Sequence, residues 1–188
     1  MRPSLRQANV NKNNPAQKLN LTEAISVLKL APSTVSSLLK GLPSHILHFS
    51  EGPEEWSPYI VLVHLIHNEK VNWVPRIKEL LSNPNVSLVS IDQLPHRIDE
   101  SVSITLLLEE FQSLRMRNLA EVGKLDITSM SLEKTGRHPS LGVIKVSEVL
   151  SAWMIHDLNH VHQISKTISH YFNSLAGPYR EFLKILDQ

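Results

Sequence analysis

The 188-residue sequence predicts an all-α fold, a four-helix bundle with a short extra helix at the C-terminus. Four long segments carry apolar residues at helical spacing, and convincing alternating strands are absent. The length is that of one ordinary domain, and a content of 41% hydrophobic and 20% charged residues is typical of a folded globular protein. Because we find no internal repeat or domain boundary, we expect residues 20–188 to form a single bundle domain.

The first two predicted helices each contain a proline. The first covers residues 21–42, and Pro32 is expected to bend or interrupt it. The second covers residues 57–81, with Ser57 as its N-cap and a local kink expected at Pro75. The rest of the chain is expected to form, in order, a loop at 82–100 with a short extended piece at 86–91, a helix at 103–125, a connection at 126–142, a helix at 146–172 and a closing helix at 177–186.

Composition limits the expected partners and the compartment. Residues 1–19 are basic, rich in Asn and Pro and without a signal peptide's apolar core, so we expect a flexible N-terminal arm. The net charge of +1 gives no overall field for nucleic acid or anionic lipid, and the longest apolar run, 59–67, is too short to span a bilayer. The absence of cysteine excludes disulfides and thiolate sites and fits a reducing compartment. We therefore expect a cytoplasmic protein with neither a nucleic-acid nor a membrane partner.

Histidines within the last long helix are the main functional signal. An α-helix advances about 100° per residue, so His156 and His160 point the same way and can reach one metal ion. Their row continues through Trp153 and Gln163 and should face inward, whereas His162 lies about 200° from His160 and should face away. A His-x-x-x-His pair is only moderately specific for a metal, so a third ligand from another helix is needed.

The second predicted helix supplies that third candidate. His64 lies in the apolar stretch "IVLVHLIHNE", and facing helices of a bundle commonly build metal sites from inward side chains. His67, about 60° further around, is a competing ligand or an outer-shell partner. Each metal-bound imidazole should donate its other N–H to an acceptor. The candidates are Gln163, about 20° from His156 on the helical wheel, and then Asp157 and Glu69. For Glu69 the alternative is an ion pair with a nearby Arg or Lys.

Other functional motifs are incomplete. No Glu is followed by His three residues later, as a ferritin-like di-iron site requires, and "HNEKV" has Asn where a zinc protease needs Glu. The stretch "GRHPSLG" lacks the glycine spacing of a phosphate loop. A Ser–His–Asp triad stays open, although no Gly-x-Ser-x-Gly elbow occurs. Arg115 and Arg117 are expected on a solvated helix face, because the basic residues are scattered among acids.

Three separated blocks resemble the DinB-like superfamily of small bacterial four-helix proteins. Residues 54–81 resemble its Trp-Ser…His-Leu…Glu…Trp…Arg-Ile pattern. Residues 138–164 are similar to its His-Pro-x-Leu-Gly…Trp-x-x-His-Asp-x-x-His-x-x-Gln-Ile pattern, and residues 171–186 to its closing Tyr…Gly-Pro…Leu segment. The resemblance covers about residues 20–187, and one departure is Lys145, where a Thr or Ser helix cap is expected.

The resemblance implies a divalent metal held by one histidine of the second helix and two of the last, which are His64, His156 and His160 here. Nitrogen ligands without thiolate suit zinc, nickel, iron or cobalt. It also implies an enzyme acting on an unidentified small molecule, either a hydrolase or a transferase that uses a low-molecular-weight thiol, with no catalytic residue assigned. The alternative is a non-catalytic metal-binding or stress-response protein. In either case a homodimer is expected.

Overall fold

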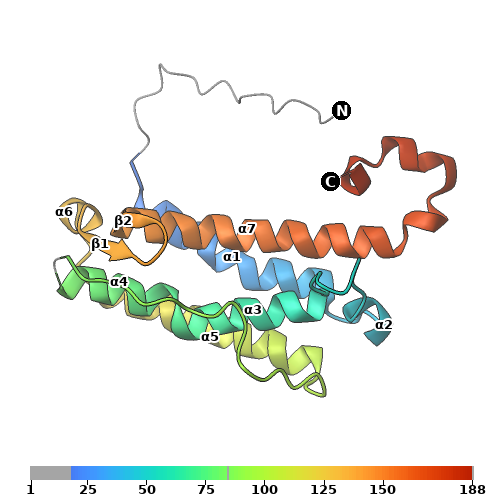
Figure 1. Ribbon diagram of the computed structural model, residues 1–188, viewed down its shortest axis with the longest axis horizontal. Coiled ribbons are helices and arrows are strands. Elements are labelled where there is room, and N and C mark those ends of the chain that lie inside the picture. Colours follow the sequence, from blue (N-terminus) through green and yellow to red (C-terminus); the bar gives the residue numbers. More distant parts are fainter. Residues whose placement is uncertain (1–17, 84, 188) are drawn as a thin grey trace.

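The computed structural model describes residues 18–83 and 85–187 and is mostly helical (Figure 1). Its long helices are α1 (Leu21–Leu39), α3 (Pro58–Val71), α4 (Trp73–Ser82), α5 (Ile104–Lys124) and α7 (Val146–Tyr171). Its shorter elements are α2 (Ser44–Leu47), α6 (Ser129–Leu132), β1 (Thr135–His138), β2 (Gly142–Lys145), and the 3-10 turns η1 (Asn173–Leu175), η2 (Gly177–Phe182) and η3 (Lys184–Asp187). Most of the expected N-terminal arm, residues 1–17, lies outside the described residues.

The bundle contains two pairs of parallel helices. α1 and α7 run side by side in one direction, while α3, its continuation α4, and α5 run in the opposite direction (Figure 1). Lys70 of α3 pairs with Glu110 of α5, and further along both segments Lys78 of α4 pairs with Glu121 of α5, as expected for helices that run in the same direction. The described residues 85–103, which follow α4 in the sequence and precede α5, carry the chain back along the bundle, and this makes the arrangement possible.

The buried interior is divided into two apolar clusters with a polar layer between them. One cluster contains Leu62, Phe111 and Ile164, and the other contains Ile77 and Leu150. Along α3 to α4, α5 and α7 the two clusters are separated by buried polar residues, which are His64, Asn68, Glu69, Arg115, Asn118, Asp157 and His160. Each of these helices therefore changes from apolar to polar and back at the same level of the bundle.

Prolines affect the two helices differently. The expected second helix is divided at Asn72, which lies three residues before Pro75 and has φ and ψ of −103° and −75°, so that α3 ends at Val71 and α4 begins at Trp73. This agrees with the expected kink, because a proline has no N–H for the carbonyl four residues earlier. By contrast, α1 runs without interruption through Pro32. Ser57 caps α3 as expected, since its hydroxyl accepts from the backbone N–H of Ile60.

The expectation of an irregular connection at 126–142 was wrong in one respect, because part of this segment forms a β-hairpin. Strands β1 and β2 pair in antiparallel register from Thr135 opposite Lys145 to His138 opposite Gly142. The extended piece expected at 86–91 forms a bridge from Ser87 to β1. The closing segment consists of 3-10 turns in place of one regular helix. Among the described residues, each helix is too short or too polar to cross a membrane.

Candidate metal centre

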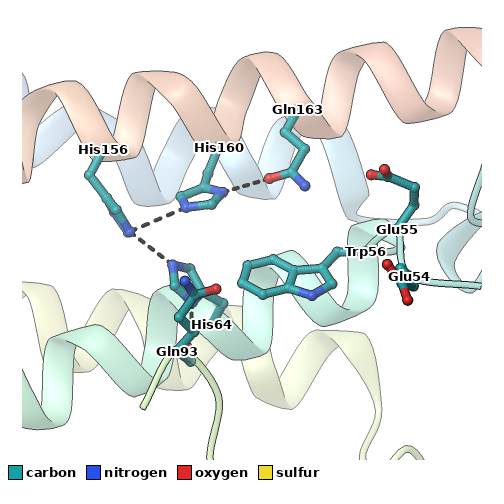
Figure 2. Close-up of a pocket in the computed structure, with 8 residues that line it drawn as sticks. All are labelled: Glu54, Glu55, Trp56, His64, Gln93, His156, His160 and Gln163. Atoms are coloured by element: carbon teal, nitrogen blue, oxygen red, sulfur yellow. Dashed lines mark hydrogen bonds between the residues drawn. The ribbon is translucent and has the colours of Figure 1, made fainter. Parts of the chain in front are cut away.

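Three histidine rings from two helices converge on one point. His64 comes from α3, and His156 and His160 come from successive turns of α7 (Figure 2). The Nε2 atom of His156 lies 2.9 Å from Nε2 of His64 and 3.2 Å from Nε2 of His160. Each ring offers one nitrogen to a group whose atoms all lie within 4.8 Å of one another, so the three rings can hold a metal ion together.

The hydrogen bonds of two rings determine which nitrogen carries the proton. Nδ1 of His64 donates to the backbone carbonyl of Gln93 at 2.6 Å, and Nδ1 of His160 donates to Oε1 of Gln163 at 2.8 Å. Burial lowers the pKa of both His64 and His160 to about 4, so both rings are neutral at pH 7. A neutral imidazole has one N–H, and therefore the Nε2 atoms of both residues are unprotonated and lie within 3.2 Å of Nε2 of His156.

This arrangement fits a divalent metal. With Zn–N bonds of about 2.0–2.1 Å, tetrahedral geometry separates two ligand nitrogens by roughly 3.3 Å, which is close to the observed Nε2 separations. His156 can donate an Nε2–H to only one of its two neighbours, whereas a cation satisfies all three lone pairs. Its Nδ1 is buried without a hydrogen-bond partner in the described part of the chain, and the nearest carboxylate oxygen, Oδ1 of Asp157, is 3.9 Å away.

An open pocket adjoins the three histidines. It has a volume of about 510 Å³ and is lined, besides the three rings, by Glu54, Glu55, Trp56, Gln93 and Gln163 (Figure 2). The Trp56 ring lies 4.7 Å from that of His64 and is stacked at 6.2 Å from that of His160, forming one wall. A small molecule can therefore approach the point where the nitrogens converge, which three-ligand catalytic sites require.

Two residues expected around the site make other contacts. Gln163 pairs with His160 and not with His156, because seven residues along a helix correspond to about 10 Å of rise despite the favourable angle. His67 is not part of the cluster, since its Nε2 lies 3.0 Å from the backbone carbonyl of Asp92 in the loop outside the pocket. His162 is exposed, as the helical wheel predicts.

Arg115 is buried, and the expectation of a solvated face was wrong for this residue. Its side chain is 0% exposed and donates to both oxygens of Asp157, at 2.7 and 3.1 Å, and to Oε1 of Glu69 at 2.8 Å. Glu69 also accepts from the indole N–H of Trp153 and the amide of Asn118. Glu69 thus forms the ion pair named as its alternative and does not contact the histidine rings.

The sequence contains a signal for Arg115 but none for some of the pocket residues. Phe111, Arg115, Asn118 and Val122 follow one another at helical spacing and are all buried, so the apolar stripe of α5 includes the arginine. Gln93, by contrast, contributes only its backbone carbonyl, which any residue could provide. Lys145 stands at the N-cap of α7, where the family pattern has Thr or Ser. Its backbone N–H donates to the Glu148 side chain at 2.8 Å, so this end of the helix is still capped.

Comparison with known proteins agrees with this fold. The structure of YfiT from Bacillus subtilis, described as a probable metal-dependent hydrolase with an unusual four-helix bundle topology, is similar with a TM-score of 0.72. The two chains are 18% identical over 86% of this chain and 95% of YfiT, a likeness that shows the shared fold. A search among curated proteins finds no sequence match. The model of the DinB superfamily matches residues 28–164, which include all three histidines, and the chain therefore belongs to the DinB superfamily.

Proposed function

We propose that this protein is a divalent-metal-dependent enzyme in which His64, His156 and His160 hold zinc, nickel or iron through their Nε2 atoms. One observation carries the proposal: His64 and His160 are held by hydrogen bonds with their bare Nε2 atoms turned to a shared point beside an open pocket. Three neutral nitrogen ligands with open access are characteristic of catalytic metal sites. The family membership and the metal-dependent activity ascribed to YfiT support the same conclusion.

Hydrolysis is the reaction that the pocket supports best. A bound metal ion of this kind supplies a water molecule with a pKa near ~7. The pocket is lined by two carboxylates, Glu54 and Glu55, and one of them is our candidate for the general base that accepts the proton of the attacking water. Trp56 limits the pocket on one side and positions the apolar part of the substrate, while Gln93 and Gln163 keep the rings of His64 and His160 in their metal-binding tautomer.

Transfer of a low-molecular-weight thiol is the second candidate reaction. The chain contains no cysteine, so the thiol in such a reaction must come from a small molecule. A pocket of about 510 Å³ has room for a thiol together with a second substrate. The same open volume favours an enzyme over a non-catalytic metal-binding protein, for which a filled pocket is expected.

Metal analysis of untagged protein tests the proposal. We expect about one equivalent of divalent metal in the wild type after reconstitution, and less than a tenth of that in His64→Ala and His160→Ala. His162→Ala is the matched control, since His162 lies on the same helix but is exposed, and its metal content should equal that of the wild type. A wild type without stoichiometric metal after reconstitution, or metal loss in the control, would show that the three-histidine site is wrong.

We also infer that the protein forms a homodimer through α1 and α7. Leu30, Ile155 and Leu158 are 63%, 65% and 59% exposed on these two neighbouring helices. Exposed apolar side chains that lie together favour association. Light scattering should give twice the mass of the chain for the wild type and a shift toward the monomer for Leu158→Glu. A wild-type monomer at high concentration would contradict the inference.

A further inference from the structure

A second pocket shares His64 and Gln93 with the pocket of the metal centre and is otherwise lined by different residues. It has a volume of about 230 Å³ and lies between α3, the first turn of α4, the loop at 90–93 and the turn at 138–140. Its polar lining includes Asn68, Asn72, Arg76 and His138. We propose that this pocket binds a small oxyanion, a carboxylate or a phosphate, with Arg76 as its cationic partner and His138 as a second donor.

Arg76 carries a positive charge without a carboxylate partner among the described residues. Its Nη2 donates to the backbone carbonyl of Val89 at 3.1 Å, and its Nε is buried without a partner. No carboxylate of the described residues lies within ion-pair distance of Arg76, whereas buried Arg115 contacts two. Burial lowers the pKa of Arg76, and the negative charge of Glu79 only partly offsets this. A partly buried cation of this kind is stabilised by a counter-ion, and an anion in the pocket provides one.

His138 supplies a second hydrogen-bond donor to the lining of this pocket. Its Nδ1 accepts from the backbone N–H groups of Ser140 at 3.2 Å and Leu141 at 3.3 Å. The neutral ring therefore carries its proton on Nε2, which makes that atom a donor. Burial and, to a smaller extent, the positive charge of Arg76 lower the pKa of His138, which favours the neutral ring with its single N–H.

Asp92, the carboxylate that lines this pocket, does not form an ion pair with Arg76. Its side chain is 73% exposed, and its Oδ2 lies 3.8 Å from Nε2 of His96. Asp92 instead offers its backbone carbonyl to His67. The anion site thus remains electrostatically incomplete without an external ligand. Arg76 donates to the backbone carbonyl of Val89, and His64 donates to the backbone carbonyl of Gln93 in the same loop. An anion bound to Arg76 would therefore lie between α4 and the loop that contacts the metal centre.

Phosphate and acetate titrations of the metal-free protein test this proposal. NMR signals of the His138 ring and the Arg76 Nε–H group should shift saturably in the wild type. The affinity should fall at least tenfold in Arg76→Gln and less in Arg76→Lys, which keeps the charge. Arg137→Gln is the matched control, because it removes the same positive charge at an exposed position next to His138. We expect wild-type affinity there.

The zinc-loaded protein distinguishes this pocket from the metal as the place where phosphate binds. Equal phosphate affinity with and without zinc supports the pocket, whereas phosphate binding that requires zinc and is unchanged in Arg76→Gln indicates coordination by the metal and contradicts the proposal. The absence of saturable binding in both forms, or equal affinity in the wild type and a folded Arg76→Gln variant, would overturn the proposal. Because the first titration needs no metal, this site and the metal centre can fail independently.

Discussion

The guanidinium of Arg115 donates a 2.7 Å hydrogen bond to the backbone carbonyl of Leu28. In a regular helix that carbonyl accepts from the residue four positions later, which here is Pro32 and has no N–H. Arg115 therefore replaces the missing donor, and α1 continues through its proline. Since the same guanidinium binds Asp157 and Glu69, one buried side chain joins all four members of the bundle.

We predict that Arg115→Met strongly destabilises the protein. The substitution leaves two buried carboxylates and the Leu28 carbonyl without their donor, and breaking a buried ion pair in this way costs about 3–5 kcal/mol. Chemical denaturation should show the loss in the free energy of unfolding. Arg117→Met, at an exposed position two residues away, should stay within about 0.5 kcal/mol of the wild type. Equal effects of both substitutions would contradict the buried role of Arg115.

A double-mutant cycle tests the link between Arg115 and Pro32. Alanine at position 32 restores an N–H for the Leu28 carbonyl, so Pro32→Ala should raise the free energy of unfolding more in the Arg115→Met background than in the wild type. The coupling between neighbouring groups of this kind is about 0.5–3 kcal/mol. Additive effects would indicate that the hydrogen bond from Arg115 does not compensate for the N–H that the Leu28 carbonyl lacks at Pro32.

Metal affinity should depend on Gln163 but not on the side chain of Gln93. Gln163 holds His160 with its side-chain oxygen, whereas Gln93 holds His64 with its backbone carbonyl. Loss of such an outer partner typically lowers metal affinity by about 10–100-fold. We therefore expect a weaker metal affinity for Gln163→Ala in competition with a chelator, and nearly wild-type affinity for Gln93→Ala. The reverse order would contradict the proposed role of these hydrogen bonds.

The stability of the metal-free protein should decrease in mild acid. The pKa of His64 and His160 is lowered to about 4 in the folded state, from 6.5 for an unperturbed histidine. Between these values the unfolded chain binds more protons, so the free energy of unfolding is highest above pH 6.5 and falls as the pH decreases toward 4. Denaturation of chelator-treated protein across this range measures the effect. His64→Asn should give a shallower decrease, and an unchanged slope would argue against a neutral buried His64.

Substitution of Glu54 and Glu55, our candidates for the general base, should separate catalysis from metal binding. Glu54→Gln and Glu55→Gln change the pocket wall but none of the three converging nitrogens. Once a hydrolysed ester or amide is found, one of the two variants should lose about 10²–10⁴-fold in kcat with unchanged metal content. Full activity in both variants would exclude these carboxylates as the proton acceptor.

Local periodicity accounts for much of the predicted site. His156 and His160 are one turn apart within one helix, so their common direction follows from helical geometry alone. His64 could be placed opposite them because a polar residue in an apolar stripe points into the bundle, and the structure brings its ring next to theirs. The metal ligation itself stays a prediction. The wheel placed Gln163 beside the wrong histidine because it shows angles and ignores the rise along the helix axis.

By itself, the sequence determined the helices, their inward faces and the common direction of His156 and His160, since these depend on residues within a few turns of one another. Only the tertiary structure decided which groups complete them: the Gln93 carbonyl on His64, Arg115 between Asp157 and Glu69, and the two walls of the Arg76 pocket. These contacts join segments tens of residues apart. Their partners are selected by the packing of whole helices and loops, which no local pattern records.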